Sequence, residues 1–232
     1  MKPHHPLIIA SSCFFCSCLF AYEQQIITAD ERKPFHYQTD QGDISGSAAK
    51  TLTCALDKMD VRYIVKFLPW LRAQTKVKQG KASAFFAASQ SNTRDEYATL
   101  SIPFVKQSWN WYVLKGSNLL PDSLDFKHNA QVTGIFGANA SVWAKNNGYN
   151  LVVHKLDNLN SMVTLAELKR VDAIFGSSVL FNEYLTTHNK MHLFDIIVES
   201  DKSWGIYYSN DYLSRNTGFL EELNSNLKLC TQ

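Results

Sequence analysis

The chain has 232 residues, 45% of them hydrophobic and 19% charged, with 23 Lys and Arg against 21 Asp and Glu. Charge this nearly balanced excludes the basic face of a nucleic-acid-binding protein and an acidic tail. The length and the ordinary hydrophobic content allow one large domain or two smaller lobes that each bury a core.

The N-terminal segment predicts export. Lys2 gives a basic opening, and the stretch from Leu7 to Ala21 consists of apolar or small, uncharged residues. Such a segment is too short to span a bilayer as a helix, but it has the length of a signal-peptide core. We expect cleavage after Ala21 and a periplasmic mature protein, which keeps 22 basic residues (the 23 less Lys2) against 21 acidic ones. Lipidation at Cys13 is the alternative.

Strands and helices alternate over residues 26 to 88. Pro stands at the start of the second expected helix and Gly just past its end, which are the positions that these residues favour. The run from Ala84 to Ala88 lacks polar alternation and therefore predicts a strand covered on both faces. The expected elements are a strand over Ile26–Ala29, a helix over Ser47–Met59, a strand over Ile64–Leu68, a helix from Pro69 to Gly80 and a strand over Ala82–Ala88.

The loop after the last of these strands carries the chemistry of an anion site. The carboxyl end of a parallel strand opens onto the ligand crevice of an α/β domain. Here Ser89 begins a loop of hydroxyl and amide side chains that ends in Arg94. Hydroxyls, amides and a guanidinium suit a small anion, most simply a carboxylate. The alternatives are a turn-forming Ser89 and a surface Arg94 paired with Asp95 or Glu96.

The order of these features resembles a known family. Gly80, the strand Ala84–Ala88, Ser89, Arg94 and the segment Leu100–Phe104 follow one another as they do in periplasmic solute-binding proteins of the polar-amino-acid type (family 3), which collect ligands for ABC importers. The resemblance runs from about residue 26 to the C-terminus. It implies a type II periplasmic-binding-protein fold, an α/β fold with two lobes, two crossovers and a ligand cleft. It also implies a small anion or amino-acid-like ligand, an inner-membrane ABC permease as partner and a monomeric protein.

The resemblance also orders the second half of the chain. It implies a signal peptide over 1–21, a first part of lobe 1 over 22–112, lobe 2 over 113–203 and a return to lobe 1 over 204–232. The expected elements are a crossover at Ser108–Leu114, strands over Val132–Phe136, Leu151–His154, Asp172–Phe175 and Ile196–Val198, helices over Ser141–Asn146, Leu159–Lys169 and Ser178–Thr187, a second crossover at Trp204–Tyr208 and a terminal helical region over Asp211–Leu229.

Several ligand-binding roles follow from the same resemblance. Arg94 and Ser89 match the residues that hold the ligand's α-carboxylate, and Asn139 lies at a helix start that faces the ligand, where it either binds the ligand or caps the helix. Ser177 stands where amino-acid binders place the Asp that holds the α-ammonium, and Arg32 stands where an aromatic side chain is usual. Both departures move the expected cleft towards positive charge. We therefore expect the protein to bind ordinary zwitterionic amino acids weakly.

Two further expectations concern Trp70 and the cysteines. Trp70 opens the helix that follows the second strand, so it is either a flat wall of the cleft or a core residue. Cys54 and Cys230 are the two cysteines that remain outside the signal segment. An even pair in an exported protein favours a disulfide, and in the resembled family the C-terminal helix returns to the first lobe. Two separate thiols are the alternative.

The sequence does not predict an enzyme. It lacks a Gly-x-Ser-x-Gly elbow, a P-loop and a His-Glu-x-x-His motif. His188 and His192 stand four residues apart, but Asn189 and Lys190 between them and the loop-like context argue against a helical metal pair, so we expect no cofactor and no metal. The alternatives are a ligand-sensing protein without transport and a periplasmic, dehydratase-like enzyme on the same fold. For the latter, the acid or base candidates near the cleft are Glu31, His36 and Glu183.

Overall fold

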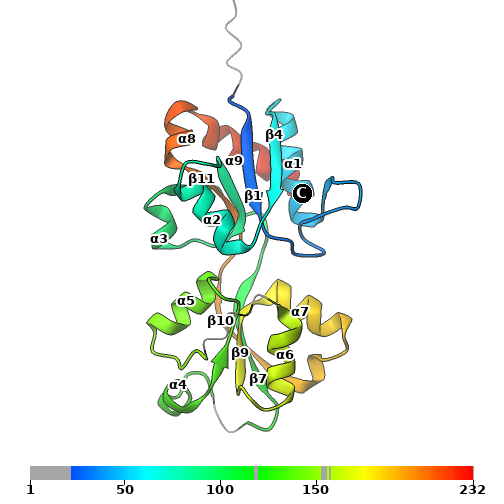
Figure 1. The fold of residues 1–232 in the computed structure, drawn as a ribbon, viewed down its shortest axis with the longest axis vertical. Helices are drawn as coiled ribbons and strands as arrows, with labels where there is room; N and C mark the ends of the chain where they lie inside the picture. The colour runs from blue at the N-terminus through cyan, green and yellow to red at the C-terminus, as the bar shows by residue number, and fades with distance from the viewer. Residues whose placement is uncertain (1–21, 118–119, 153–155, 157, 232) are drawn as a thin grey trace, which may run out of the picture.

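The computed structural model describes residues 22–117, 120–152, 156 and 158–231. The expected signal segment over 1–21 and part of the strand expected over Leu151–His154 lie outside these residues. The described chain forms two α/β lobes, one above the other along the long axis of the molecule (Figure 1). One lobe is built on a five-stranded sheet in the order β4-β1-β5-β11-β6, and the other on a four-stranded sheet in the order β10-β7-β9-β8. The predicted two-lobed α/β fold is confirmed.

The first lobe is centred on β5. All five residues of this strand are buried, as the apolar run predicted. It pairs in parallel with β1 and antiparallel with β11, so both ends of the chain contribute to one sheet. The elements of this lobe are β1 (Gln25–Ala29), β2 (Tyr37–Gln38), β3 (Ile44–Ser45), α1 (Ser47–Lys58), β4 (Tyr63–Phe67), α2 (Trp70–Lys78), β5 (Ala84–Ala88), α3 (Asn92–Asp95), β6 (Ala98–Leu100), β11 (Gly205–Ser209), α8 (Asn210–Arg215) and α9 (Phe219–Cys230).

The second lobe is centred on β7 and β9. β8 and β9 run in parallel, and the helices α5 and α7 follow them directly in the chain. The starts of both helices therefore lie at the carboxyl edge of the sheet, where α/β folds bind ligands. The elements of this lobe are β7 (Ser108–Leu114), α4 (Leu124–Asn129), β8 (Val132–Thr133), α5 (Asn139–Asn146), α6 (Leu159–Glu167), β9 (Ala173–Ser177), α7 (Ser178–Thr187), the 3-10 helix η1 (Met191–Leu193) and β10 (Phe194–Asp201).

Neither crossover is where the sequence placed it. The second expected crossover, Trp204–Tyr208, is for the most part strand β11, which pairs with β5 and β6 inside the first sheet. The first is misplaced as well. The segment expected to cross, Ser108–Leu114, is β7, which pairs with β9 and β10 inside the second sheet. The boundary expected after residue 112 thus falls within this strand, and the chain enters the second lobe before residue 108. An antiparallel bridge between Val105 and Trp204 marks where the two connecting segments run side by side. A β-rich segment shows that a strand forms but not which sheet it joins, and this explains the error.

The disulfide between Cys54 and Cys230 joins α1 to α9, as the sequence analysis predicted. The Cα atoms of the two cysteines lie 6.0 Å apart, and 176 positions separate them in the sequence. The two helices also pack through buried leucines, among them Leu52 on α1 and Leu223 on α9. The C-terminal helix is therefore fixed to the first lobe by both packing and a covalent bond.

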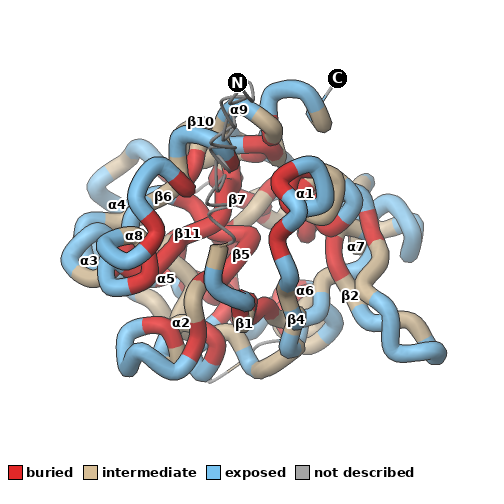
Figure 2. The backbone as a smooth tube through the Cα atoms, turned by 90° about the horizontal axis from the view of Figure 1, so that it is seen from above, coloured by how far each residue is buried: buried red, intermediate tan, exposed pale blue. Residues whose placement is uncertain are grey.

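Burial follows the two sheets. Seen from above, the buried parts of β5 and β11 lie at the centre of the molecule, and the outer turns of the helices around them are exposed (Figure 2). Local sequence determines where some helices begin: the side chains of Asn158 and Ser209 accept hydrogen bonds from the backbone amides of Ser161 and Tyr212.

Within the described residues, no helix combines the length and the apolar character that crossing a membrane requires.

Candidate functional site

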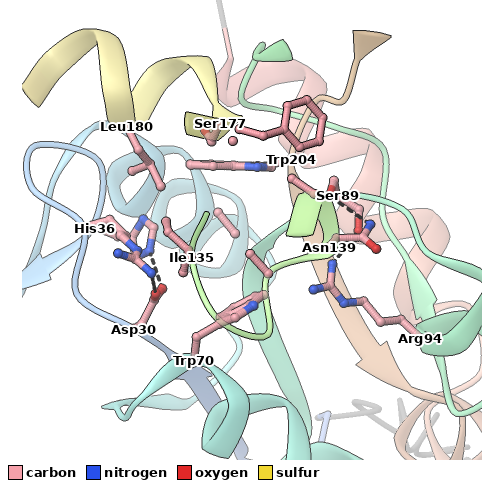
Figure 3. A pocket seen from close by; sticks show the side chains of 16 residues that line it. Asp30, His36, Trp70, Ser89, Arg94, Ile135, Asn139, Ser177, Leu180 and Trp204 are labelled. Atoms are coloured by element: carbon pink, nitrogen blue, oxygen red, sulfur yellow. Dashed lines mark hydrogen bonds and ion pairs between the residues drawn. The ribbon is translucent and has the colours of Figure 1, made fainter. Parts of the chain in front are cut away.

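A cavity of about 60 Å³ lies between the lobes, and both of them line it (Figure 3). All six residues that the sequence analysis proposed for ligand binding line this cavity: Arg32, Trp70, Ser89, Arg94, Asn139 and Ser177. The other lining residues are Asp30, His36, Ala87, Ile135, Ala138, Ala140, Phe175, Gly176, Leu180 and Trp204. The structure therefore brings together lining residues that are up to 174 positions apart, from 30 to 204.

Arg94 is a buried cation. It is 5% exposed, and its Nη1 donates a hydrogen bond to the Ser89 carbonyl at 2.8 Å while its Nε donates to Gln74 Oε1 at 2.9 Å. The surface ion pair that we considered for it is absent, because among the described residues no carboxylate pairs with Arg94, and Asp95 instead accepts a hydrogen bond from the Tyr207 hydroxyl.

The environment of Arg94 disfavours an unpaired charge. Burial lowers the pKa of its guanidinium, against smaller opposing effects of Tyr207, Tyr97 and Asp95. An arginine nevertheless stays protonated in proteins. The guanidinium also lies over the Trp70 ring at 5.3 Å. Two of its nitrogens are already bonded, which fixes its orientation, and Nη2 makes no hydrogen bond with the described residues. This group is thus held in place with donors to spare for an anion.

Asn139 links the two lobes. Its Nδ2 donates hydrogen bonds to Ser89 Oγ at 3.2 Å and to the Gln90 carbonyl at 2.6 Å. Asn139 is the first residue of α5, and neither it nor Ala138 caps that helix through a side chain. The capping alternative is therefore wrong for Asn139. The contact instead connects the start of a second-lobe helix to the loop that follows β5 in the first lobe.

Ser177 ends β9 and immediately precedes α7. Its side chain does not cap the helix, and its Oγ is buried without a hydrogen-bond partner among the described residues. A buried polar atom without a partner is uncommon in proteins. Because Ser177 lines the cavity, a ligand atom can supply the missing hydrogen bond.

Arg32 does not act as an isolated cation. Its Nη2 lies 2.5 Å from Asp30 Oδ2, and the other oxygen of Asp30 lies 3.4 Å from His36 Nε2. Burial alone would raise the pKa of Asp30, but Arg32 and then His36 outweigh it and hold the pKa below its usual value. The expected gain of positive charge at this end of the cleft is therefore wrong, since the Asp30 carboxylate compensates the guanidinium of Arg32.

Two tryptophans bound the cavity on opposite sides, with Trp204 above and Trp70 below in the view of Figure 3. Trp70 combines the two roles considered for it, because it lines the cavity and also meets the core residue Phe85 edge-on at 5.9 Å. The sequence analysis missed Trp204 as a lining residue, because its position depends on how the connecting segments meet. It also missed Asp30, whose spacing two residues before Arg32 was the available signal.

The cavity has two polar ends. In Figure 3, Asp30 and His36 lie at one end, and Ser89, Arg94 and Asn139 lie at the other, with Ile135 and the tryptophans between them. Within the described part of the chain, no group of three or more His, Cys, Asp or Glu side chains is arranged to hold a metal ion. The arrangement suits an organic molecule that carries an anionic group at one end and a different polar group at the other.

Residues 25–229 match the family model described as bacterial extracellular solute-binding proteins, family 3. No curated protein matches the chain. Among solved structures, the arginine-, lysine-, histidine-binding protein ArtJ from Geobacillus stearothermophilus is similar, with a TM-score of 0.71 and 16% identity, over 89% of this chain and 89% of that one.

Two further structures show the same fold. The GluR0 ligand-binding core from Nostoc punctiforme in complex with L-glutamate has a TM-score of 0.72 and 15% identity, over 88% of this chain and 92% of that one. The ancestral amino acid-binding protein AncCDT-1, a precursor of cyclohexadienyl dehydratase, has a TM-score of 0.69 and 16% identity, over 89% of this chain and 88% of that one. At these identities, the likeness establishes the architecture and leaves the ligand to the residues of the cavity.

Proposed function

The chain belongs to the family 3 bacterial extracellular solute-binding proteins, and from this premise we propose that it binds a small, carboxylate-bearing, amino-acid-like solute between its lobes. We propose further that it is exported to the periplasm as a monomer and passes the solute to an ABC permease. The observation that carries the proposal is the buried guanidinium of Arg94, which lines the cavity without an acidic partner among the described residues.

The argument for an anion rests on the energy of charges in a protein interior. A buried charge is costly unless it is paired and hydrogen-bonded. The planar guanidinium matches a carboxylate with two parallel hydrogen bonds, which an ammonium cannot do. The backbone around Ala138, Asn139 and Ala140 at the start of α5 lines the same cavity, and free amides at a helix start also favour an anion. These groups together support a carboxylate as the anchor of the ligand.

The size of the cavity supports a small ligand that is enclosed when the lobes close. A volume of about 60 Å³ has room for a short organic acid. We propose that the ligand enters as the lobes separate, with a hinge at the paired segments around Val105 and Trp204. The contact of Asn139 with Ser89 must break in this motion.

A thermal-shift screen of the mature protein tests the proposal. The ligands are short monocarboxylates, dicarboxylates, amino acids and, as matched controls, the corresponding primary amides. A true ligand at 100 times its dissociation constant stabilises the folded state by about 2.7 kcal/mol. We expect stabilisation by one or more acids and none by their amides. Stabilisation by uncharged solutes alone would contradict the proposal. Transport is tested separately, by uptake into cells that lack the gene.

A catalytic role is the second candidate, and one observation favours it. His36 is buried, its Nε2 faces Asp30, and its Nδ1 has no partner among the described residues although the residue lines the cavity. An imidazole oriented by a carboxylate is a common general base. The two candidates differ in the fate of the ligand. Recovery of the ligand unchanged after prolonged incubation, as judged by mass spectrometry, supports binding, whereas conversion to a product supports catalysis.

A further inference from the structure

We propose that His36, held by Asp30 and Arg32, is a second recognition point at the end of the cavity opposite Arg94, where its Nδ1 accepts a hydrogen bond from the far end of the ligand. The ligand is then a carboxylate with a distal donor, such as a hydroxyl, an amide N–H or an ammonium. This inference rests on the proposed function, since it takes the carboxylate at Arg94 as the anchor.

The unpartnered nitrogen of His36 is the first observation. The residue is 1% exposed, and its Nδ1 is buried without a hydrogen-bond partner among the described residues. Buried polar atoms in proteins almost always have a partner, so an exception in a cavity wall marks a place where a ligand completes the bonding. Ser177 Oγ is a second unpartnered atom in the same wall.

The tautomer of His36 follows from its neighbours. Nε2 faces the Asp30 carboxylate at 3.4 Å, and an ionised carboxylate only accepts hydrogen bonds, so Nε2 carries the proton. In the neutral ring this leaves the lone pair on Nδ1. Turning the ring over about the Cβ–Cγ bond would place a carbon against Asp30 and lose that contact. Packing against Phe86, with ring centroids 5.1 Å apart, and against Trp204, at 6.4 Å, also restrains the ring.

The charges around His36 select against a second anion. The guanidinium of Arg32 is within 2.5 Å of Asp30 and is already paired with it. A ligand carboxylate at this end would meet the lone pair of His36, which repels it, and the ion pair of Asp30 and Arg32, whose charges offset each other. A donor meets two acceptors instead. The far end of the cavity therefore favours a neutral or cationic donor, in contrast to the Arg94 end.

The middle of the cavity determines which chemical group can join the two polar ends of the ligand. Trp70 and Trp204 lie on opposite sides, Ile135 adds apolar surface between the two polar ends, and Leu180 adds apolar surface close to His36 (Figure 3). A short hydrocarbon chain that joins the carboxylate to the donor suits this environment. An α-ammonium would lie next to the carboxylate, near Arg94, and could not reach His36.

The test uses titration calorimetry on the mature protein with straight-chain acids of three to six carbons. Each chain length is measured as the plain acid, the ω-hydroxy acid, the ω-amino acid and the dicarboxylate. At the best length, we expect a donor at the far end to tighten binding about tenfold over the plain acid, which is the effect of one good hydrogen bond. We expect the dicarboxylate to bind no better than the plain acid.

His36→Gln is the matched variant. The glutamine amide nitrogen reaches the position of Nε2 and can still donate to Asp30, but the acceptor at Nδ1 is gone. We expect the preference for a distal donor to disappear, so that at the best chain length the ω-hydroxy acid and the plain acid bind this variant with affinities within about twofold of each other. Thermal melting of the unliganded variant checks its fold, and the ratio of two affinities measured on one variant does not depend on its stability.

The outcomes separate this inference from the proposed function. Arg94-dependent binding of acids without a preference for a donor, or with a preference for the dicarboxylate, overturns the role of His36 and leaves the proposed function standing. A donor preference that persists in His36→Gln also overturns it. If no acid binds, or if binding is unchanged in Arg94→Ala, the proposed function fails and this inference fails with it.

Discussion

The substitution Arg94→Ala probes the anchor of the proposed site. It removes a guanidinium that is 5% exposed and that donates to Ser89 and Gln74. Truncating one partner of a desolvated, hydrogen-bonded charge pair costs about 2–5 kcal/mol. At about 1.4 kcal/mol for each factor of ten, we expect the affinity for a carboxylate ligand to fall roughly 30-fold to several-thousand-fold.

The unliganded fold should survive this change. The variant loses two hydrogen bonds to Arg94, each of which contributes on the order of 0.5–1.5 kcal/mol, but it also loses a buried cation that has no acidic partner among the described residues. These effects oppose each other. We therefore expect a change of about 2 kcal/mol or less in the free energy of unfolding, against a total that is typically about 5–15 kcal/mol for a domain.

The assay is thermal melting with and without the best acid from the ligand screen. For a chain of this size, 1 kcal/mol shifts the melting temperature by about 2–4 °C, so saturation at 100 times the dissociation constant raises it by roughly 5–11 °C in the wild type. We expect almost no ligand-induced shift in Arg94→Ala. The control is Arg72→Ala, because Arg72 is an exposed arginine of α2 that does not line the cavity.

Two results would refute this reasoning. A full ligand-induced shift in Arg94→Ala would show that the carboxylate is held elsewhere. Loss of the ligand-induced shift in both variants would show that the overall positive charge of the lobe, and not the buried guanidinium of Arg94, is responsible for binding the ligand. Arg94→Lys refines the test, because it keeps the charge but loses the planar pair of donors, and we expect it to retain only part of the affinity.

Three more predictions follow from the geometry. Replacing both Cys54 and Cys230 by Ala opens a loop of 176 positions, and we expect the free energy of unfolding measured in urea to drop by about 2–4 kcal/mol; an unchanged value would mean that helix packing alone holds α9. The substitution Ser177→Asp puts a carboxylate where an α-ammonium is expected, and we expect calorimetry to show that zwitterionic amino acids bind the variant more tightly than they bind the wild type. Tight, Arg94-dependent binding of a neutral amino acid to the wild type would contradict this. The lowered pKa of Asp30 contributes stability above the unfolded-state pKa of about 4, and this stability is lost as the pH falls through the folded-state pKa. Urea unfolding between pH 3 and pH 7 should therefore show Asp30→Asn to be less stable than the wild type at pH 7, with a difference that shrinks below about pH 4.

Local patterns in the sequence were enough to predict most elements. The helix over Ser178–Thr187 has the predicted bounds, and the apolar run over Ala84–Ala88 is the buried central strand of its sheet. The short helix α3 over Asn92–Asp95 was interpreted as a loop, because four polar residues carry no periodicity. The strand β7 was assigned to a crossover, since partner choice depends on contacts with β9 and β10 that lie 60 or more positions away.

The cavity was predicted unevenly. The Arg94 end came from a motif that lies within one loop, so its residues were identifiable by order and spacing. The opposite end depends on Asp30, Arg32 and His36, which meet only when the loop after β1 folds back on itself through the bridge between Arg32 and His36. The sequence shows that an arginine replaces an aromatic residue there, but not that Asp30 neutralises it.

This neutralisation changes what the cavity selects. An unpaired Arg32 would have made both ends positive and favoured a dianion such as a dicarboxylate. With Arg32 paired to Asp30, the remaining positive charge lies at Arg94, and the far end contributes the lone pair of His36 instead of a charge. A ligand with one negative charge then suits both ends of the cavity, because its carboxylate pairs with Arg94 and its donor meets the lone pair of His36 beside the Asp30 carboxylate. Specificity in this cleft therefore follows from which polar atoms are left without partners among the described residues, and the count of charged residues in the sequence does not predict it.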